Sequence, residues 1–351
     1  MGQRIIFYLL LVLLASCREE QPSVVDRTYL QESYFLPSGI DLDIYFPDDY
    51  DDDHQYPIIY FNDGDGFANV FTTMTESKDE EILAEPFILV GLHAGQNRLN
   101  RYIPYSDPWI TQNWGQYSPL AESYSENVIK KVLPFVEGRF NIDEERRAIF
   151  GISLGGLQAT WMSMKYPETF KFSAGLSPSF WVDEYAILSE STRGITDSNR
   201  FYFDVGTKEW NYYIPLIATL QYAGLDYGEE IFYYEVENAA HNSFDWSDRI
   251  HIPFKIFLTQ PGENTIVGYN LINECIPSQS VSGRFFQKLN PIVEFRNGIT
   301  YSLITEASYR IIQGLGTIAS DGRYTVDSET MTVLVEFGDW SEEIILQNCV
   351  N

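Results

Sequence analysis

The segment from Ile149 to Gly156 constrains this chain more than any other part of the sequence. It ends an apolar run, contains Gly-x-Ser-x-Gly around Ser153, and precedes a stretch with helical spacing that stops before Pro167. A serine at such a strand-to-helix turn holds its hydroxyl above a sheet, and the N–H of the next residue, Leu154, faces a developing oxyanion. The pattern predicts a nucleophilic serine rather than a plain structural turn.

A serine nucleophile needs an acid and a base, which follow it in the order serine, acid, histidine in this class of fold. His241 lies in a loop after an expected strand, whereas His251 lies in an apolar stretch with helical spacing. We therefore expect His241 to be the base. Asp204 and Glu209 are both candidates for the acid. Glu209 is preferred because it lies beyond a glycine turn and can reach a histidine loop, while Asp204 lies on the strand itself.

The second oxyanion donor is expected in a loop after an early buried strand. The glycine-rich segment 61–67 follows such a strand, so the backbone N–H of Asp65 is the candidate beside that of Leu154. A plain β-turn is the alternative.

Aromatic side chains are the candidates for a substrate pocket. Core packing would explain any one of them equally well. The candidates are Trp181, Trp246, Trp114 and Tyr102, with Trp109 and Tyr117 nearby in the sequence. No Cys/His cluster has the spacing of a metal site and the glycine-rich turn lacks the lysine of a phosphate-binding loop, so no metal or cofactor is expected.

Two parts with different patterns follow one another along the chain. From residue 28 to residue 260, short apolar runs alternate with segments of helical spacing, which predicts an α/β fold with a mostly parallel sheet. Residues 263–351 carry short β-type runs separated by turn signals such as Asn297–Gly298 and Asp321–Gly322, which predicts a small all-β, sandwich-like domain.

The β-rich segment is expected to have a core of its own and to act as an accessory module. On that hypothesis, a chain cut near Gly262 keeps its fold. The competing hypothesis is that the segment covers apolar surface of the larger domain. Cys275 and Cys349 bracket the segment and can form a disulfide, or remain as two free buried thiols.

The first residues indicate export and lipid attachment. Arg4 precedes the apolar run 5–14, which is shorter than the roughly 20 apolar residues of a spanning helix, so residues 1–16 are predicted to be a lipoprotein signal peptide. The sequence ending at Cys17 resembles a bacterial lipobox, which implies cleavage after residue 16 and lipid on Cys17; a secreted protein with a chance cysteine is the alternative. Residues 17–27 read as a polar tether, and their acidic start indicates the cell surface rather than the periplasmic face of an outer membrane.

Several of these motifs together resemble the putative-esterase, or esterase D-like, α/β-hydrolases, which include feruloyl and acetylxylan esterases and enterochelin-type siderophore esterases. The resemblance covers residues 34–258. It implies a triad of Ser153, Glu209 and His241 and an oxyanion amide after Asp63–Gly64. One departure is that Arg101 stands where the family often has an acid. The matching segments are 56–64, 151–156, 176–181, 205–209, and His241 with Trp246.

The sequence therefore predicts a lipid-anchored, extracytoplasmic serine ester hydrolase acting on acylated glycans or ester siderophores. A net charge of -27 argues against a nucleic-acid partner, which needs a basic surface. The alternatives are an acyltransferase on the same scaffold and a non-catalytic surface-binding protein.

Overall fold

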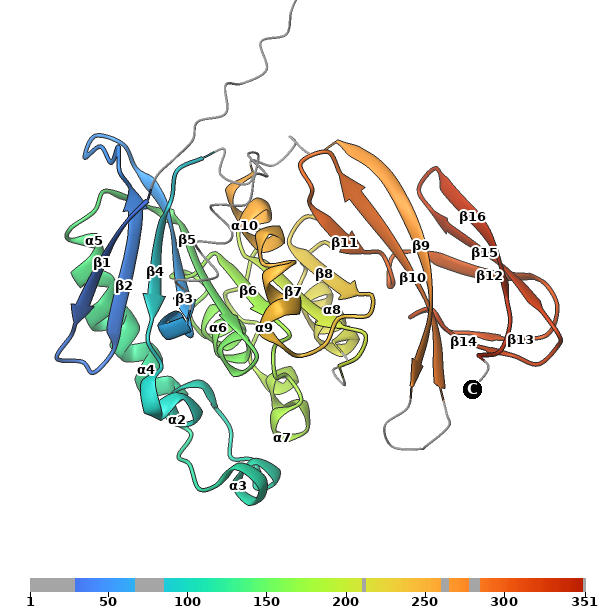
Figure 1. Ribbon diagram of the computed structural model, residues 1–351, viewed down its shortest axis with the longest axis horizontal. Coiled ribbons are helices and arrows are strands. Elements are labelled where there is room, and N and C mark those ends of the chain that lie inside the picture. Colours follow the sequence, from blue (N-terminus) through green and yellow to red (C-terminus); the bar gives the residue numbers. More distant parts are fainter. Residues whose placement is uncertain (1–28, 67–84, 210–212, 260–264, 278–284, 350–351) are drawn as a thin grey trace, which may run out of the picture.

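A computed structural model describes residues 29–66, 85–209, 213–259, 265–277 and 285–349. Its larger part is built on an eight-stranded sheet with the order β1-β2-β4-β3-β5-β6-β7-β8 (Figure 1). The strands from β4 to β8 run parallel, and β2 and β1 extend the sheet antiparallel. Their bounds are β1 Tyr29–Phe35, β2 Asp41–Pro47, β3 Tyr56–Asn62, β4 Ile88–Leu92, β5 Ile142–Ile152, β6 Phe172–Leu176, β7 Arg200–Gly206 and β8 Ile231–Val236.

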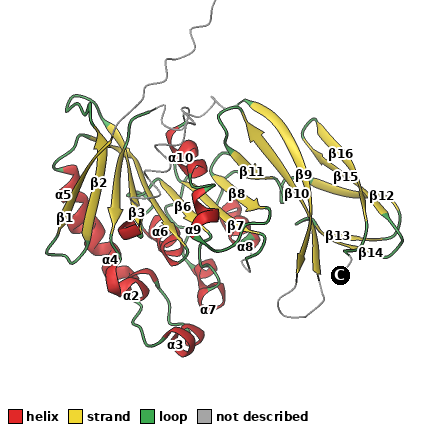
Figure 2. Cartoon of the chain, viewed as in Figure 1, coloured by secondary structure: helices red, strands yellow, loops and turns green. Residues whose placement is uncertain are grey.

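Helices cover both faces of this sheet (Figure 2), which is why β3, β4 and β6 are buried along their whole length and read as continuous apolar runs. One face packs against α4 (Ala121–Asn127), α5 (Leu133–Glu137), α6 (Leu154–Lys165) and α8 (Ile214–Tyr222), and the other against α10 (His251–Leu258). A π-helical turn, Val128–Val132, joins α4 to α5. No helix in the described part of the chain is long and apolar enough to cross a membrane. The predicted signal peptide and tether lie outside the described residues.

The C-terminal part consists of antiparallel strands in two sheets, as the sequence predicts. One sheet pairs β9 (Ile266–Pro277), β10 (Phe285–Phe295), β11 (Thr300–Ser302), β13 (Gly316–Ile318) and β14 (Arg323–Val326); the other has the order β12 (Ser308–Gln313), β15 (Met331–Phe337), β16 (Trp340–Leu346). Leu289, Met331 and Val335 belong to a small core of this part. A disulfide joins Cys275 to Cys349 with the two Cα atoms 6.1 Å apart.

The two parts also share a buried cluster, in addition to the small core that the β-rich segment has of its own. Val293, Tyr301 and Leu303 belong to the same buried cluster as Phe232 of β8 and Phe254 of α10. The segment thus has its own core and also covers apolar surface of the α/β part, and the fold of a chain cut near Gly262 stays a prediction.

Polar contacts reinforce this shared interface. The ammonium of Lys288 donates to both carboxylate oxygens of Glu235 at 2.9 and 2.6 Å. The backbone N–H of Glu235 donates to the hydroxyl of Ser302 at 2.9 Å, and its carbonyl accepts from the side-chain amide of Asn290 at 2.9 Å. Side chains of the C-terminal part therefore satisfy the N–H and the carbonyl of Glu235 on β8, the edge strand of the large sheet.

Candidate active site

Ser153 sits on the turn between β5 and α6 in a backbone conformation that few side chains adopt. Its φ is 57° and its ψ is -117°, and such strained conformations cluster at functional sites. The turn is possible because a Cβ on Gly151 would lie 2.2 Å from the carbonyl oxygen of Gly155. The N–H of Ser153 donates to the carbonyl of Leu176 at 2.9 Å, which ties the turn to the end of β6.

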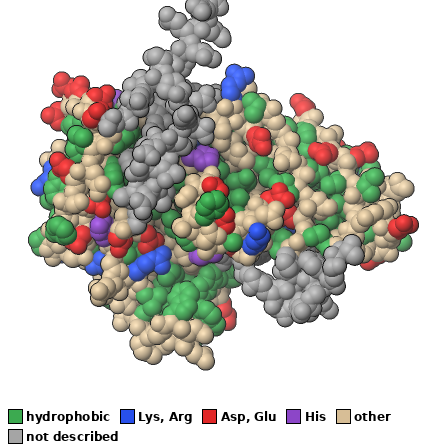
Figure 3. All heavy atoms as spheres, viewed as in Figure 1, with side chains coloured by type: hydrophobic (Ala, Val, Ile, Leu, Met, Phe, Trp, Pro, Cys, Tyr) green, Lys and Arg blue, Asp and Glu red, His purple; other side chains and the backbone are tan. Residues whose placement is uncertain are grey.

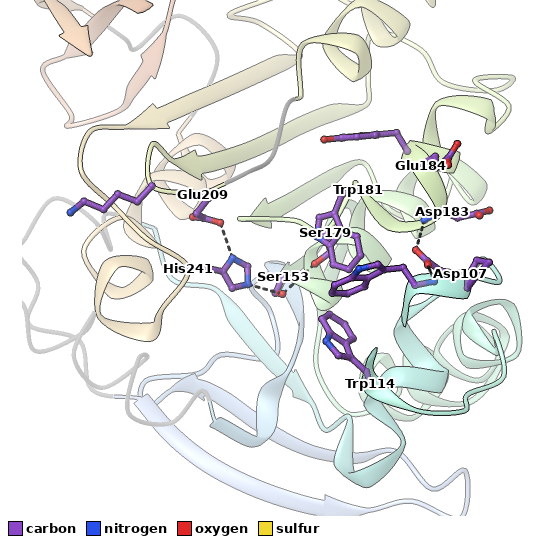
Figure 4. Close-up of a pocket in the computed structure, with 13 residues that line it drawn as sticks. Asp107, Trp114, Ser153, Ser179, Trp181, Asp183, Glu184, Glu209 and His241 are labelled. Atoms are coloured by element: carbon purple, nitrogen blue, oxygen red, sulfur yellow. Dashed lines mark hydrogen bonds and ion pairs between the residues drawn. The ribbon is translucent and has the colours of Figure 1, made fainter. Parts of the chain in front are cut away.

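The structure brings the predicted base and acid to this serine (Figure 4). Nε2 of His241 lies 2.9 Å from the hydroxyl oxygen of Ser153, and Nδ1 lies 2.7 Å from Oε2 of Glu209. Because an ionised carboxylate only accepts hydrogen bonds, Nδ1 carries the proton and Nε2 is left to accept from the serine hydroxyl. The arrangement has the geometry of a nucleophile, a base and an orienting acid.

Hydrogen bonds between two loops explain why Glu209 and His241 meet. The turn after β7 packs so closely on the loop after β8 that a Cβ on Gly206 would lie 2.2 Å from the carbonyl oxygen of Ala239. The N–H of Lys208 donates to this same carbonyl at 3.0 Å. Asp245, which follows His241 in the sequence, also holds this loop, because its Oδ2 accepts from the N–H of Ala240 at 2.7 Å.

Of the two candidate acids, Glu209 contacts His241 and Asp204 does not. Asp204 is fully buried and pairs with Nε of Arg249 at 3.0 Å. Burial raises the pKa of the Glu209 carboxyl, but hydrogen bonds from His241, Ser177 and Gly206 outweigh burial and hold that pKa below its usual range. The acid next to the histidine is therefore ionised near neutral pH.

The two segments expected to supply oxyanion amides lie side by side. The side chain of Asn62 donates to the carbonyl of Gly155 at 3.1 Å, and a Cβ on Gly155 would lie 2.4 Å from Oδ2 of Asp63. The carboxylate of Asp65, in the short 3-10 helix Gly64–Gly66, accepts from the N–H groups of Ala94 and Gly95 and so braces this loop. The roles of the Asp65 and Leu154 amides stay predictions.

Arg98, at the start of α2 (Arg98–Tyr102), holds the same loop to the strand that ends in the nucleophile. Its guanidinium donates to both carboxylate oxygens of Asp63, at 2.5 and 2.9 Å, and to the carbonyl of Ile152 at 3.2 Å. Arg101, which stands where the family often has an acid, donates instead to the carbonyls of Gly39, His93 and Ala94.

A cavity of about 1200 Å³ opens beside Ser153 and is lined on one side by three tryptophans. We call it the aromatic pocket. Trp109 and Trp114 of α3 (Pro108–Trp114) and Trp181 pack edge to face, with ring centroids 5.5 to 5.7 Å apart. Trp109 and Trp114 are 52% and 49% exposed, so broad indole surface is available to a ligand. Apolar side chains gather over α3 and α7 (Val182–Tyr185) in Figure 3.

An unusual backbone holds the far wall of the aromatic pocket. Asp183, Glu184 and Tyr185 all have a left-handed conformation, with φ between 49° and 64°, which is rare for consecutive residues other than glycine. Asp107 braces them: its carboxylate accepts from the N–H groups of Trp109 and Ile110 in α3 and from that of Asp183 at 2.7 Å.

Two of the four predicted pocket residues lie elsewhere. Tyr102 is fully buried, and its hydroxyl accepts from the N–H of Asp63, so it supports the oxyanion loop instead. Trp246, in α9 (Ser243–Ser247), packs its edge against His241 with centroids 4.9 Å apart and donates to Ser177. Both predictions were wrong because an aromatic residue in a motif can pack behind a site as well as line it. Trp114 and Trp181 do line the cavity.

Sequence reasoning missed Ser177, Arg249 and Asp107. The only signal for Ser177 was its place in the segment 176–181 that carries the family resemblance. The described residues hold no group of three or more His, Cys, Asp or Glu side chains that could bind a metal ion.

A family model described as putative esterase matches residues 33–246, which is more than half of the chain and includes Ser153, Glu209 and His241. The chain belongs to the putative esterase family. Family membership, together with the geometry around Ser153, assigns this esterase to proteins that act on ester substrates.

Two curated relatives of this esterase come from one organism, and one of them is named as an esterase. The ferri-bacillibactin esterase BesA from Bacillus subtilis (strain 168) is 25% identical over 154 residues, covering 39% of this chain and 52% of BesA. The uncharacterized protein YbbA from the same organism is 24% identical over 169 residues, covering 47% of this chain and 67% of YbbA.

Solved structures show the same fold. The BES protein from Bacillus cereus superposes with a TM-score of 0.51 at 18% identity, covering 74% of this chain and 98% of that one. The enterobactin esterase FES from Shigella flexneri, solved in the presence of enterobactin, gives a TM-score of 0.52 at 17% identity, covering 66% of this chain and 58% of that one. This esterase thus spans little more than half the length of FES and of BesA.

Proposed function

We propose that this esterase is a serine carboxylic-ester hydrolase whose triad is Ser153, His241 and Glu209. The observation that carries the proposal is the continuous chain of contacts from the Glu209 carboxylate through both nitrogens of His241 to the Ser153 hydroxyl. His241 takes the proton of Ser153 as the hydroxyl attacks the acyl carbon, and later protonates the leaving alcohol. Amides of Leu154 and Asp65 stabilise the oxyanion, and water then releases the acyl group from Ser153.

Of the two substrate classes expected from the sequence, the aromatic pocket favours acylated glycans over ester siderophores. Indole faces offer apolar surface on which a sugar or acyl ring can pack. Asp183 and Glu184 lie at the far wall, and among the described residues that line the pocket Lys208 is the single cationic side chain. Because clefts of one sign repel ligands of the same sign, these acidic side chains favour a neutral glycan over a ligand that carries several negative charges.

We propose in addition that the enzyme is attached to the outer membrane by lipid on Cys17, with the tether 17–27 between the membrane and the catalytic domain. The support is the lipobox-like end of the apolar run before Cys17. Cys17→Ser should move the protein from the membrane fraction to the soluble fraction, because the acyl chains supply the membrane affinity. Unchanged sedimentation with membranes in detergent-free fractionation would contradict the anchor.

The test of the enzymatic proposal is Ser153→Ala. We expect it to abolish labelling by a fluorophosphonate and to lower turnover of a small activated ester by at least about 10³-fold, since little but oxyanion binding remains. Ser163→Ala is the matched control, because Ser163 is a buried serine of α6 that bonds to the carbonyl of Phe170 away from the site. Turnover by Ser153→Ala close to that of the control would refute the assignment.

A further inference from the structure

Ser177 lies at the centre of a buried hydrogen-bond network behind the triad. It follows β6 directly and has a left-handed backbone, with φ 46°. Its hydroxyl oxygen lies 2.7 Å from Nη2 of Arg249, 2.9 Å from Nε1 of Trp246 and 2.6 Å from Oε1 of Glu209. Ser177 is fully buried, so water does not compete for these three contacts.

The chemistry of the three partners fixes the direction of each hydrogen bond. A guanidinium and an indole N–H can only donate, so Arg249 and Trp246 occupy both acceptor positions of the Ser177 hydroxyl. The single proton of that hydroxyl then has one acceptor within reach, which is Oε1 of Glu209. Ser177 is thereby held as a donor to the acid and cannot reorient without breaking another bond.

This donation determines which oxygen of Glu209 serves the histidine. Oε1 also accepts from the N–H of Gly206 at 2.9 Å and lies 3.5 Å from Nη2 of Arg249, so three donors, with Ser177 the nearest, hold it. Oε2 is left to accept from Nδ1 of His241. Loss of the Ser177 donor would remove the shortest contact of Oε1, leave it held by Gly206 and the longer Arg249 contact, and so loosen the carboxylate that orients the imidazole toward Ser153.

Asp204 is the remaining member of this hydrogen-bond network. Its carboxylate pairs with Arg249 at 3.0 Å and accepts from the N–H of Ser177 at 3.0 Å and from the hydroxyl of Tyr202 at 3.0 Å. Both Asp204 and Arg249 are buried, so the guanidinium stays in place as a donor to Ser177. The Asp204 carboxylate thus affects His241 only indirectly, through Ser177 and Glu209.

We propose that Ser177 is a positioning residue of the triad, which holds Glu209 in the orientation that His241 requires through a hydroxyl whose donor direction Arg249 and Trp246 impose. The proposal rests on the proposed function of Ser153, Glu209 and His241. It assigns to Ser177 an effect on turnover that is transmitted through Glu209 alone, without contact to the substrate.

The first test is Ser177→Ala, assayed on a small ester. We expect kcat to fall by about tenfold to a hundredfold, with KM changed less than about threefold, because the acid loses its orientation while the pocket is untouched. Ser173→Ala is the matched control: Ser173 is also fully buried on β6, and its hydroxyl has no hydrogen-bond partner among the described residues. The control should keep wild-type kcat. Wild-type kcat in Ser177→Ala would overturn the proposal.

A double-mutant cycle with Glu209→Gln separates positioning from general destabilisation. If Ser177 acts through Glu209, Ser177→Ala should cost less than about threefold in the Glu209→Gln background. An equal fold-loss in both backgrounds would overturn the proposal. If Ser177→Ala does not fold, Ser177→Cys replaces it, since a thiol is a weaker donor of similar shape; wild-type kcat there would also overturn it. Retained turnover in Ser153→Ala would instead refute the proposed function itself.

Discussion

Asp204 and Glu209 are two buried carboxylates five positions apart, and their different surroundings give them different roles. Glu209 faces the histidine, and Asp204 faces a guanidinium. The sequence supported a preference for Glu209 because a residue beyond a glycine turn has more freedom to reach another loop. It could not reveal Arg249 as the partner of Asp204, because the contact joins a strand to a segment 45 positions further along the chain.

This difference predicts opposite outcomes for two conservative substitutions. Glu209→Gln should lower kcat by about 10²- to 10⁴-fold with little change in stability, because the histidine loses its orienting acid. Asp204→Asn should lower kcat far less but reduce the free energy of unfolding by about 3 kcal/mol, because the buried Arg249 charge loses the nearer of its two carboxylate partners and keeps only Glu209 at 3.5 Å.

Steady-state kinetics and urea unfolding of both variants check this prediction. A variant pair in which Asp204→Asn is the inactive but stable member would show that the two carboxylates exchange roles. Asp248→Asn is a suitable control, because Asp248 is an exposed carboxylate near the same loops.

At the scale of elements, the sequence predicted the strands of the sheet well and the pocket wall poorly. Continuous apolar runs such as 57–61 and 86–91 identify buried parallel strands because both faces need apolar side chains. The left-handed residues 183–185 could not be foreseen, since none is glycine. Their conformation depends on the Asp107 carboxylate, which reaches Asp183 across 76 residues of chain.

The wall that Asp107 braces should determine how bulky substrates bind. Trp181→Ala should raise KM for an acylated oligosaccharide by about tenfold, the equivalent of about 1.4 kcal/mol of lost ring packing, and leave KM for a small acetate ester unchanged. Tyr222→Ala is the control, because Tyr222 is 95% exposed on α8 and does not line the pocket. Equal KM values for Trp181→Ala and the control on the oligosaccharide would mean that the indole does not contact the sugar.

At the scale of the whole molecule, the interface between the two parts contains a carboxyl whose ionisation is energetically unfavourable. Glu274 of β9 is 5% exposed, and neither of its carboxylate oxygens has a hydrogen-bond partner among the described residues. Burial, reinforced by the negative charges of Glu235 and Glu237 and opposed by Lys288, raises the pKa of Glu274 to about 8. The proton on this carboxyl therefore contributes to holding the two parts together.

The sign of the resulting pH dependence follows from proton binding. Between pH 4.5 and about 8 the native state keeps the Glu274 proton and the unfolded state does not, so stability falls as the pH rises through this window. Glu274→Gln carries a neutral group at every pH. We expect this variant to match wild type near pH 5 and to be more stable at pH 9, by up to about 5 kcal/mol.

Urea unfolding at the two pH values, with the disulfide intact, measures this difference. Glu342→Gln, which changes an exposed glutamate of β16, should leave the pH dependence of wild type unaltered. Parallel pH profiles for Glu274→Gln and wild type would contradict a proton held at the interface.

The contacts that Ser302 and Asn290 make to the backbone of Glu235 also bear on how copies of this protein behave when crowded. An edge strand with free peptide groups is a template on which a strand of another molecule can add, and repeated addition leads to aggregates. At β8 the N–H and the carbonyl of Glu235 are already taken by side chains. The proposed lipid anchor would concentrate copies of the protein on a membrane surface at high local density. The C-terminal part would then oppose self-association of the protein at that surface.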